Sequence, residues 1–393
     1  MASTFSNWSG LITSSPEIIR SIATLEETIE AVNYAQEQAI PIRTVGSTHS
    51  HSPIFYNDGG MIITTDNLTS PITIDEQNRT ATIPAGVKLS AATQELWSKG
   101  FSFSNQGDVD VQSIAGLIAT GVHGTGINHP SISSNVVDVS ILTAAGTITK
   151  ASESQETLEA ARLNLGVLGI VMDVTFQVVP RFYLHEHHWQ EKINDLTANL
   201  DTFVTENDHF EFFWNPGDDM AYAKTLNPHD GPSDGLPNQK GQYIDRAHIV
   251  FPSERTEKHT EMEYSVPYEK GLECFQQIRR LIRNGTHNVV WPVEYRTVAA
   301  DTGWISPALD RNTVTISVHQ GITEPHELFF REAEQIFLAY DGRPHWGKRH
   351  YLNKEQIATI YGDGWNQFWD IQRQLDPNGL FINTYMHNLQ PEE

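Results

Sequence analysis

The sequence predicts an α+β fold with two domains, and three observations support this prediction. The chain has 393 residues, which is long enough for two hydrophobic cores. Up to residue 180, helical stretches and short strand-like runs follow one another without the regular strand–helix–strand repeat of a parallel sheet. Beyond Pro180, polar and apolar residues alternate over longer segments, as expected of antiparallel strands. We therefore place a domain boundary near Pro180.

In the first part, two segments have the spacing of a helix. Residues 17–39 carry apolar residues at helical intervals, and residues 88–99 do so until Gly100 ends the pattern. Residues 165–180 begin as a tight glycine turn and continue as a strand. The other strand-like runs, each bounded by turn residues, cover residues 61–64, 72–74, 81–85 and 136–143.

The second part begins with a strand-like alternation over residues 209–214. A stretch rich in glycine, proline and aspartate, residues 227–241, predicts an exposed loop. Residues 325–340 predict a helix with one apolar face, and residues 354–375 predict a last helix before the turn at 376–379.

Composition limits the possible partners. The net charge of −23 argues against nucleic acid and against an anionic membrane surface. It also disfavours an anionic substrate, so a neutral polyol, sugar or lactone suits the chain better, although the charge also serves solubility. No apolar run approaches the ~20 residues of a membrane span, and the N-terminal residues lack the pattern of a signal peptide. Cys274 is the single cysteine, so we expect no internal disulfide and a cytoplasmic location.

The most informative motif is RTVGSTHSHSP at residues 43–53. It follows a short strand-like run, and a turn of glycine, serine and threonine after a strand gathers backbone N–H groups that bind phosphate. A histidine inside such a turn can act as a nucleophile or a covalent tether beside a bound cofactor. The alternative is a surface turn with two ordinary histidines.

This motif resembles the vanillyl-alcohol-oxidase-type flavoproteins, and within them the aldonolactone and alditol oxidases. The resemblance implies that His49 carries FAD covalently through the 8α-methyl group of the flavin. It also implies that the surrounding residues bind the pyrophosphate of FAD, namely Arg43, Gly46, Ser47, Thr48 and Ser50.

A second motif, QSIAGLIATGVHGTG at residues 112–126, gathers small residues where a backbone approaches a flat ligand closely. It resembles the flavin-binding segment of the same family, and a glycine-rich helix contact is the alternative. The resemblance implies that Ser113 lies near the reactive edge of the flavin and that Gly116, Gly121, His123 and Gly124 line the cofactor channel. The dinucleotide fingerprint of a Rossmann fold is absent from the sequence, which disfavours a nicotinamide cofactor.

A third motif, GVLGIV at residues 166–171, is a common glycine turn before a strand. In the family this turn packs against the adenosine half of FAD, so the resemblance implies backbone contacts from Ile170 and Val171. A fourth motif, PVEYRT at residues 292–297, places Glu294 and Arg296 on one face of a strand. A solvated ion pair is the alternative there.

The family uses this Glu-x-Arg pattern to hold substrate hydroxyls. Ser317 and His319 share a face in the alternating run 314–319, which we expect beside that strand. They depart from the alditol-oxidase pattern of a histidine followed two residues later by threonine, which leaves the substrate open. The HEHH run at residues 185–188 looks like a metal cluster, but neighbouring strand residues point to opposite sides, so we expect no metal.

A fifth motif, GRPHWGK at residues 342–348, is specific to the lactone and alditol oxidase branch. The resemblance implies that Lys348 lies by the pyrimidine edge of the flavin, where a fixed cation stabilises the anionic reduced form. His345 is expected to reach the pocket, and an exposed basic loop is the alternative. We expect Lys348 and Arg296 to serve catalysis rather than stability.

The resemblance covers about residues 13–387 and implies a fold and a reaction. The fold is a PCMH-type FAD-binding domain of residues 1–180, completed by the tail 376–393, with an antiparallel-sheet substrate domain of residues 181–375. The reaction is oxidation of a sugar-derived polyol or aldono-1,4-lactone, with hydride transfer to the flavin and reoxidation by O₂ to give H₂O₂.

Two other functions stay open at this point. A dehydrogenase of the same substrate class would pass its electrons to a quinone or cytochrome. A flavin-binding module without turnover is the other alternative, and the charged set of Glu294, Arg296 and Lys348 speaks against it because a passive binder needs no charged pocket.

Overall fold

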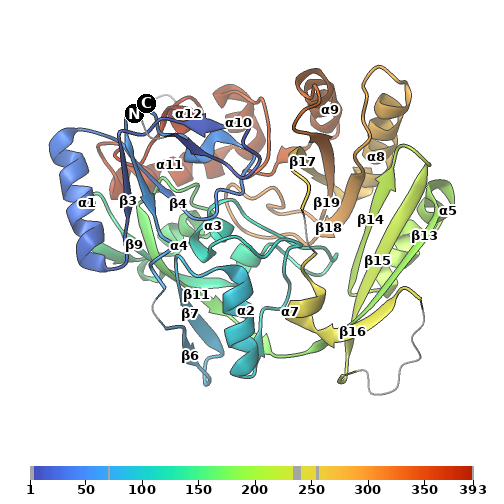
Figure 1. Ribbon diagram of the computed structural model, residues 1–393, viewed down its shortest axis with the longest axis horizontal. Coiled ribbons are helices and arrows are strands. Elements are labelled where there is room, and N and C mark those ends of the chain that lie inside the picture. The colour runs from blue at the N-terminus through green and yellow to red at the C-terminus, as the bar shows by residue number, and fades with distance from the viewer. Residues whose placement is uncertain (1–3, 70, 233–239, 254–255, 392–393) are drawn as a thin grey trace.

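The structure is a computed structural model that describes residues 4–69, 71–232, 240–253 and 256–391. The chain forms two halves, which lie on the left and right of Figure 1. The first half contains a parallel and an antiparallel sheet, and the second half contains one large antiparallel sheet. The predicted α+β class and the antiparallel character of the second half are confirmed.

The first half is built on two sheets. The parallel sheet has the strand order β3-β5-β4, and the antiparallel sheet has the order β10-β9-β11-β7-β6. Two short strand pairs, β1-β2 and β12-β8, complete it. The strands are β1 Phe5–Ser6, β2 Thr13–Ser14, β3 Ile18–Ser21, β4 Ile42–Val45, β5 Met61–Thr64, β6 Thr73–Asp75, β7 Thr80–Pro84, β8 Phe101–Ser102, β9 Val136–Leu142, β10 Ile148–Lys150, β11 Ile170–Gln177 and β12 Val179–Pro180.

Helices and helical turns connect these strands. They are α1 Leu25–Gln38, the 3₁₀ turn Pro53–Phe55, α2 Leu89–Ser98, α3 Ile114–Ala119, the 3₁₀ turns Ile132–Asn135 and Ala151–Glu153, and α4 Gln155–Arg162. The predicted helix 17–39 was wrong at its start, because residues 18–21 pair with β5 as a parallel strand. The helix begins only after Thr24, whose side chain accepts a hydrogen bond from the N–H of Glu27.

The second half is an eight-stranded antiparallel sheet, called the large sheet below. Its strand order is β16-β13-β15-β14-β18-β19-β17-β20. The strands are β13 Tyr183–Lys192, β14 His209–Asn215, β15 Met220–His229, β16 Gln242–Arg246, β17 His259–Pro267, β18 Val293–Val298, β19 Thr313–Gly321 and β20 Arg343–Pro344. The helices of this half are α5 Ile193–Ala198, α6 Leu200–Glu206, α7 Ala247–Val250, α8 Tyr268–Arg283 and α9 Glu327–Ala339.

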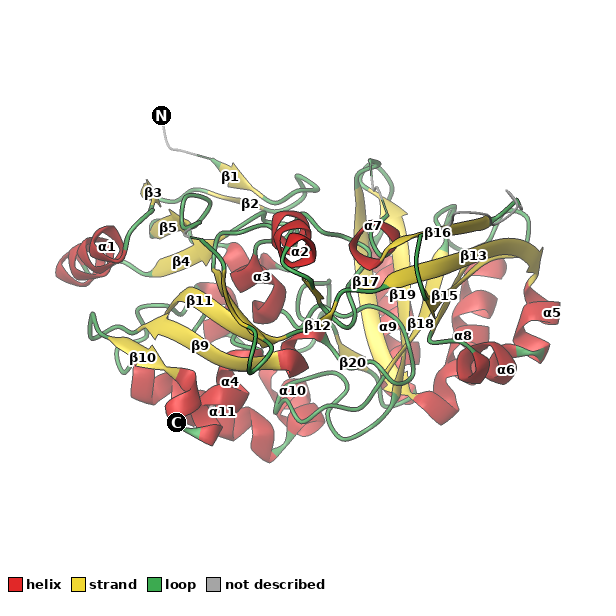
Figure 2. Cartoon of the chain, turned by 90° about the horizontal axis from the view of Figure 1, so that it is seen from below, coloured by secondary structure: helices red, strands yellow, loops and turns green. Residues whose placement is uncertain are grey.

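Helices α5, α6, α8 and α9 share one hydrophobic core with the large sheet (Figure 2). Strand β15 continues to His229, so the predicted loop 227–241 begins later than expected, and residues 233–239 lie outside the described residues. No helix of the described residues has the length and apolar content that a bilayer crossing needs.

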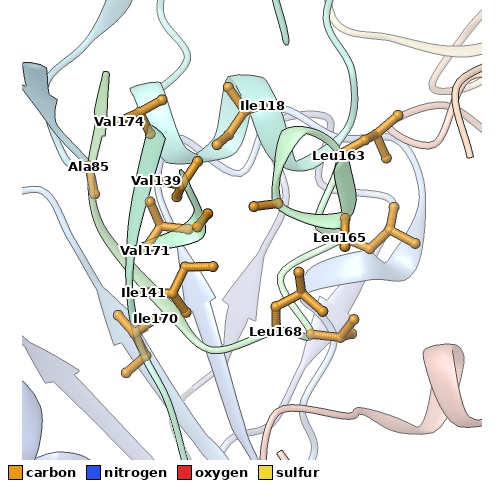
Figure 3. Close-up of a cluster of buried hydrophobic side chains, with 14 of the residues drawn as sticks. Ala85, Ile118, Val139, Ile141, Leu163, Leu165, Leu168, Ile170, Val171 and Val174 are labelled. Atoms are coloured by element: carbon orange, nitrogen blue, oxygen red, sulfur yellow. The ribbon is translucent and has the colours of Figure 1, made fainter. Parts of the chain in front are cut away.

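The last helices are α10 Lys354–Tyr361, α11 Asp363–Leu375 and α12 Thr384–His387. The single helix predicted over 354–375 was wrong, because Gly362 breaks it with a left-handed backbone (φ 55°). Apolar residues of all three helices belong to the core of the first half, which Figure 3 shows in part. The domain boundaries at 180 and 376 stay a prediction. Ile305 and Trp346, which lie before residue 376, already belong to the core of the first half.

Candidate active site

A large cavity lies between the two halves. It encloses about 1320 Å³ of empty space, counted to its open mouth. The first half contributes the segments 43–55, 107–123 and 165–166, and the second half contributes residues of β17, β18 and β19 together with the 345–348 segment.

The loop of residues 46–50 follows the edge strand β4 and forms one wall. Within the described part of the chain, none of its five backbone N–H groups donates to another group of the protein. Thr48 takes a left-handed conformation (φ 49°), which turns consecutive N–H groups into one concavity. A Cβ on Gly46 would lie 1.9 Å from Oγ of Ser113, so only glycine lets the two motifs approach this closely.

Two histidines of this loop region reach the cavity. The ring of His49 stacks on Trp8 with centroids 4.7 Å apart, and His51 packs at 5.5 Å from His259. Burial, aided by the charge of Lys348, lowers the pKa of His49 to about 4. The imidazole of His49 is therefore neutral at pH 7, and its nitrogen lone pair is free for bonding. Burial likewise holds the pKa of His51 well below its ordinary value.

The second motif forms the floor of the cavity. Ser113 caps α3 by accepting a hydrogen bond from the N–H of Gly116 at 3.3 Å, and both residues line the cavity. His123 lines it as well, and its Nε2 lies 2.8 Å from Oε1 of Glu263. Gly121 and Gly124 lie in the same segment but not in the lining. Each packs against a neighbour, Leu163 and Gln106 respectively.

Arg43 is buried and holds three segments together. Its guanidinium donates to the carbonyl oxygens of Leu165 and Gly166 at 2.8 Å and of Phe381 at 2.9 Å. Burial lowers its pKa to about 10, so it is a cation at neutral pH. The third motif joins the cavity lining through Gly166, next to Leu165, whereas Ile170 and Val171 lie outside the lining. Figure 3 shows these two among the apolar side chains of β11.

One face of the large sheet forms the opposite wall. Glu263 lies opposite Ser317 and Glu261 lies opposite His319 on β17 and β19. Ser317 in turn lies opposite Glu294 on β18. Three predictions are confirmed. Glu294 shares a face with Arg296, Ser317 shares a face with His319, and the two strands lie side by side. Ser317 itself lies outside the cavity lining. Its hydroxyl donates a hydrogen bond to Oε2 of Glu263 at 2.5 Å.

Glu261 is the centre of the first charge cluster. Its carboxylate forms an ion pair with Lys348 and lies 3.6 Å from Nε2 of His319 and 3.8 Å from Nε2 of both His51 and His259. Burial alone would raise the pKa of Glu261, but Lys348, His319 and His259 together hold it well below its ordinary value. Glu261 is therefore a fixed negative charge.

Glu263 is the centre of the second charge cluster. It forms an ion pair with Arg296, which also lies 3.2 Å from Oε2 of Glu294. Burial would raise the pKa of Glu263, but Arg296 and His123 hold it well below its ordinary value. Lys348 and Arg296 are thus paired with buried carboxylates, and the expectation that they serve catalysis rather than stability stays a prediction. Removing either cation leaves a buried charge uncompensated.

His345 reaches the cavity, as expected, with its ring 5.5 Å from that of His123. Burial lowers its pKa to about 3, so it is neutral. The HEHH run at 185–188 lies on β13 outside the lining, and His188 instead lies 3.1 Å from Glu186.

Sequence reasoning missed Glu261, Glu263, His51 and His259. The alternation that identified Glu294 and Arg296 is also present over residues 259–263, where His259, Glu261 and Glu263 occupy every second position. That signal was available in the sequence. Their joint burial against Lys348 and Arg296 was not, because it depends on pairings between distant strands.

Comparisons with known proteins agree with this geometry. A sequence profile for D-arabinono-1,4-lactone oxidase matches residues 174–243 and 235–389, and a profile for an FAD binding domain matches residues 16–152. An L-gulono-1,4-lactone dehydrogenase of Mycobacterium tuberculosis (strain ATCC 25618 / H37Rv) is 34% identical over 98% of each chain. The L-gulonolactone oxidase of Mus musculus is 26% identical over 98% of each chain, and an alditol oxidase of a Streptomyces species is 26% identical over 99% of each.

Solved structures share the fold at lower identity. Cholesterol oxidase from B. sterolicum superimposes with a TM-score of 0.86 at 19% identity, covering 100% of this chain and 97% of that one. A 6-hydroxy-D-nicotine oxidase from Arthrobacter nicotinovorans superimposes with a TM-score of 0.75 at 16% identity, covering 99% and 97%. This chain belongs to the aldonolactone and alditol oxidase family of FAD-binding oxidoreductases.

Proposed function

We propose that this protein oxidises an alcohol group of a sugar-derived polyol or aldono-1,4-lactone, with FAD bound covalently through His49 and O₂ as the electron acceptor. The observation that carries the proposal is the convergence of His49, Glu294, Arg296 and Lys348 on one cavity from opposite halves of the chain. Relatives named for lactone and alditol substrates support the substrate class.

The residues of the cavity fit FAD. The five backbone N–H groups of the 46–50 loop have no acceptor among the described residues, so they suit a pyrophosphate. Gly46 lets this loop lie close to Ser113. Buried polar atoms of the lining without a partner in the described chain include Nε of Arg296, Nδ1 of His51 and Oε1 of Gln112, which a ligand can satisfy. Bound FAD supplies a two-electron acceptor for a hydride from the substrate carbon.

The residues of the large sheet would act on the substrate. Glu294 and Arg296 offer one acceptor and one donor side by side, which suits neighbouring hydroxyl groups. Lys348 supplies a positive charge fixed by Glu261, and such a preorganised charge stabilises negative charge that develops during the reaction. His319, Ser317 and His345 complete the polar set around these groups.

A dehydrogenase is the second candidate. The Mycobacterium tuberculosis relative at 34% identity carries that name, so a quinone or cytochrome is an alternative acceptor to O₂. A panel of polyols, sugars and lactones, assayed for peroxide under air and for dye reduction without oxygen, separates the two. Peroxide formed in step with substrate supports the oxidase, and dye reduction without peroxide supports the dehydrogenase.

Covalent attachment is tested by acid precipitation. We expect the precipitate to stay yellow and a flavin adduct to appear on the peptide that contains His49. His49→Ala should still bind FAD, because the N–H groups of the 46–50 loop remain, but its precipitate should be colourless. His51→Ala is the matched control and should stay yellow. A colourless wild-type precipitate contradicts covalent attachment.

A further inference from the structure

Lys88 is a cation beside the 46–50 loop to which the proposed function gives no role. It directly precedes α2, and its Nζ donates a hydrogen bond to Oγ of Ser47 at 2.8 Å. Ser47 lines the cavity, whereas Lys88 does not. The ammonium group of Lys88 therefore reaches the loop from outside the cavity lining.

The backbone around Lys88 is held against the second motif. The N–H of Leu89 donates to the carbonyl oxygen of Gln112 at 2.9 Å, and Lys88 and Ser113 form an antiparallel β-bridge. Gln112 and Ser113 both line the cavity. Lys88 is therefore fixed at the place where the second motif meets the 46–50 loop, and the position of its ammonium group does not depend on a mobile chain segment.

The charge of the cofactor makes a cation at this place significant. The pyrophosphate of FAD carries two negative charges, and the net charge of −23 on the chain repels it, so local cations must offset these charges. Among the described residues, the lysines and arginines of the cavity lining are Arg43, Arg296 and Lys348. Arg296 and Lys348 already pair with buried carboxylates of β17 on the opposite wall. On the side of the 46–50 loop, the lining offers Arg43, and Lys88 lies directly behind it.

The donors of Arg43 and Lys88 are committed to different degrees. The guanidinium of Arg43 donates to three backbone carbonyl oxygens of other segments. The ammonium group of Lys88 has three N–H donors, and the described residues supply two acceptors, Ser47 and, at 2.7 Å, Asp66. The side chains of Lys88 and Asp66 are 35% and 54% exposed, and an ion pair this exposed is weak. One donor and the positive charge of Lys88 are thus available to a second anion.

We propose that Lys88 is a cation of the FAD site, which offsets negative charge of the pyrophosphate from behind Ser47. In this arrangement the backbone N–H groups of the 46–50 loop supply the direct hydrogen bonds, and Lys88 supplies a charge that these neutral donors lack. Because Lys88 acts through Ser47, it is a positioning residue. Its role rests on the FAD site of the proposed function, but it requires neither the covalent bond to His49 nor a particular substrate.

The first test measures the affinity for FAD in His49→Ala, which holds the cofactor without a covalent bond. Flavin fluorescence on dilution of the holoprotein gives the dissociation constant. Adding Lys88→Met should raise this constant about tenfold, the order expected for one interaction with a charged group. Lys88→Arg should recover most of the affinity. Raising salt from about 0.05 M to about 0.5 M should bring Lys88→Met and its parent closer together, because salt screens the lost attraction.

Lys150→Met is the matched control. Lys150 has the same kinds of partner as Lys88, since it donates to Oγ of Ser140 at 2.5 Å and pairs with Asp138 at 3.4 Å, and its side chain is 44% exposed. It belongs to the same half but does not contact the 46–50 loop, so its loss should leave FAD affinity unchanged. Asp66→Asn removes the anion that competes for Lys88 and should tighten FAD binding, which is an effect opposite to that of Lys88→Met.

The second test keeps His49 and decides the matter if His49→Ala retains no FAD. Chain produced in riboflavin-poor medium is incubated with FAD, and bound flavin is followed against FAD concentration. We expect the half-saturating concentration to be about tenfold higher for Lys88→Met than for wild type and unchanged for Lys150→Met.

The outcomes separate the role of Lys88 from the proposed function. Equal FAD affinity of Lys88→Met and its parent overturns the role of Lys88 alone, and so does an equal loss in Lys88→Arg, which would show that shape rather than charge matters. Wild-type chain that binds no FAD at any concentration overturns the FAD site and the role of Lys88 with it. Failure of every polyol, sugar or lactone to reduce a bound flavin overturns the proposed reaction and does not affect the role of Lys88.

Discussion

The two faces of the large sheet are both buried at strand β17, yet they have opposite chemistry. On β17, where every residue is buried, Met262 and Tyr264 face the helical core, and the ring of Tyr264 stacks on Phe337 of α9 at 5.0 Å. On the other face of the same strand, His259, Glu261 and Glu263 line the cavity. Period-two alternation usually separates a buried face from a solvated one. Here it separates the face that stabilises the fold from the face that binds the ligand.

This difference teaches how stability and function are divided. The apolar face stabilises the fold by removing hydrocarbon from water. The polar face holds buried carboxylates that are tolerated because Lys348 and Arg296 pair with them. Substitutions on the first face should therefore change stability with normal kinetics, and substitutions on the second should change kinetics.

The largest expected effect lies in the core that α8 forms with the apolar face of the large sheet. Phe275→Ala removes a fully buried ring that packs edge-on against Phe212 at 5.2 Å, and should lower the free energy of unfolding by about 3–5 kcal/mol. Denaturant titration measures this loss. Leu328→Ala on α9, at a side chain 72% exposed, is the control and should change it by less than about 0.5 kcal/mol. A large drop in kcat per folded Phe275→Ala molecule would contradict the division between the faces.

On the polar face, Lys348→Met should slow reduction of the bound flavin by about a hundredfold or more, the effect of losing one preorganised charge. Stopped-flow absorbance without oxygen measures this rate. The melting temperature should also fall, because Glu261 loses its cation. Lys348→Arg keeps the charge and should recover most of the rate. A Lys348→Met enzyme of normal rate would mean that this pair is structural only.

Arg296→Lys keeps the positive charge on the polar face but removes the planar guanidinium group that can donate to two carboxylates at once. The guanidinium reaches both Glu263 and Glu294, which an ammonium group cannot copy. We expect KM to rise about tenfold with a smaller change in kcat, consistent with the loss of one hydrogen bond to substrate. Arg283→Lys, in an exposed pair with Asp219, should leave steady-state kinetics unchanged.

The smallest effect is a difference in pH dependence between two acids of the polar face. Burial of Glu211 on β14 raises its pKa to about 7 in the folded protein, against ~4.3 in an unfolded chain. Its contribution to stability is therefore fully present below pH ~4.3 and is lost as pH rises through 7. Glu211→Gln should flatten the dependence of unfolding free energy on pH in this window by at most about 1.4 kcal/mol per pH unit.

Glu263 should behave in the opposite way, because Arg296 and His123 outweigh its burial and lower its pKa. Its contribution is present above pH ~4.3 and is lost as pH falls below that value. Glu263→Gln should therefore flatten the acid side of the stability profile. If Glu211→Gln and Glu263→Gln changed the pH dependence of the unfolding free energy in the same way, the two carboxyl groups would not have opposite pKa shifts.

Much of the site could be predicted because its signals are local. Glycine positions near Gly46 and Ser113 reflect close backbone approach, and two-residue spacing placed Glu294 and Arg296 on one face. The strand Ile18–Ser21 was not predictable in this way, because the spacing of its apolar residues also fits a helix. What makes it a strand is its parallel pairing with β5, which lies more than 40 residues further along the chain. The ion pairs of Glu261 and Glu263 likewise join residues far apart in sequence, which no local pattern contains.

The buried guanidinium of Arg43 has a consequence for how the enzyme is made. Arg43 bonds to Phe381, 338 residues further along the chain. The amide of Asn383 also donates to the carbonyl oxygens of Pro53, Ile54 and Tyr56. A ribosome that adds about 5–20 residues per second needs roughly 20–70 s to cover this distance. The nascent N-terminal segment must wait that long for these partners, so the wall of the cavity around Arg43 is completed only after residues 381 and 383 have been synthesised.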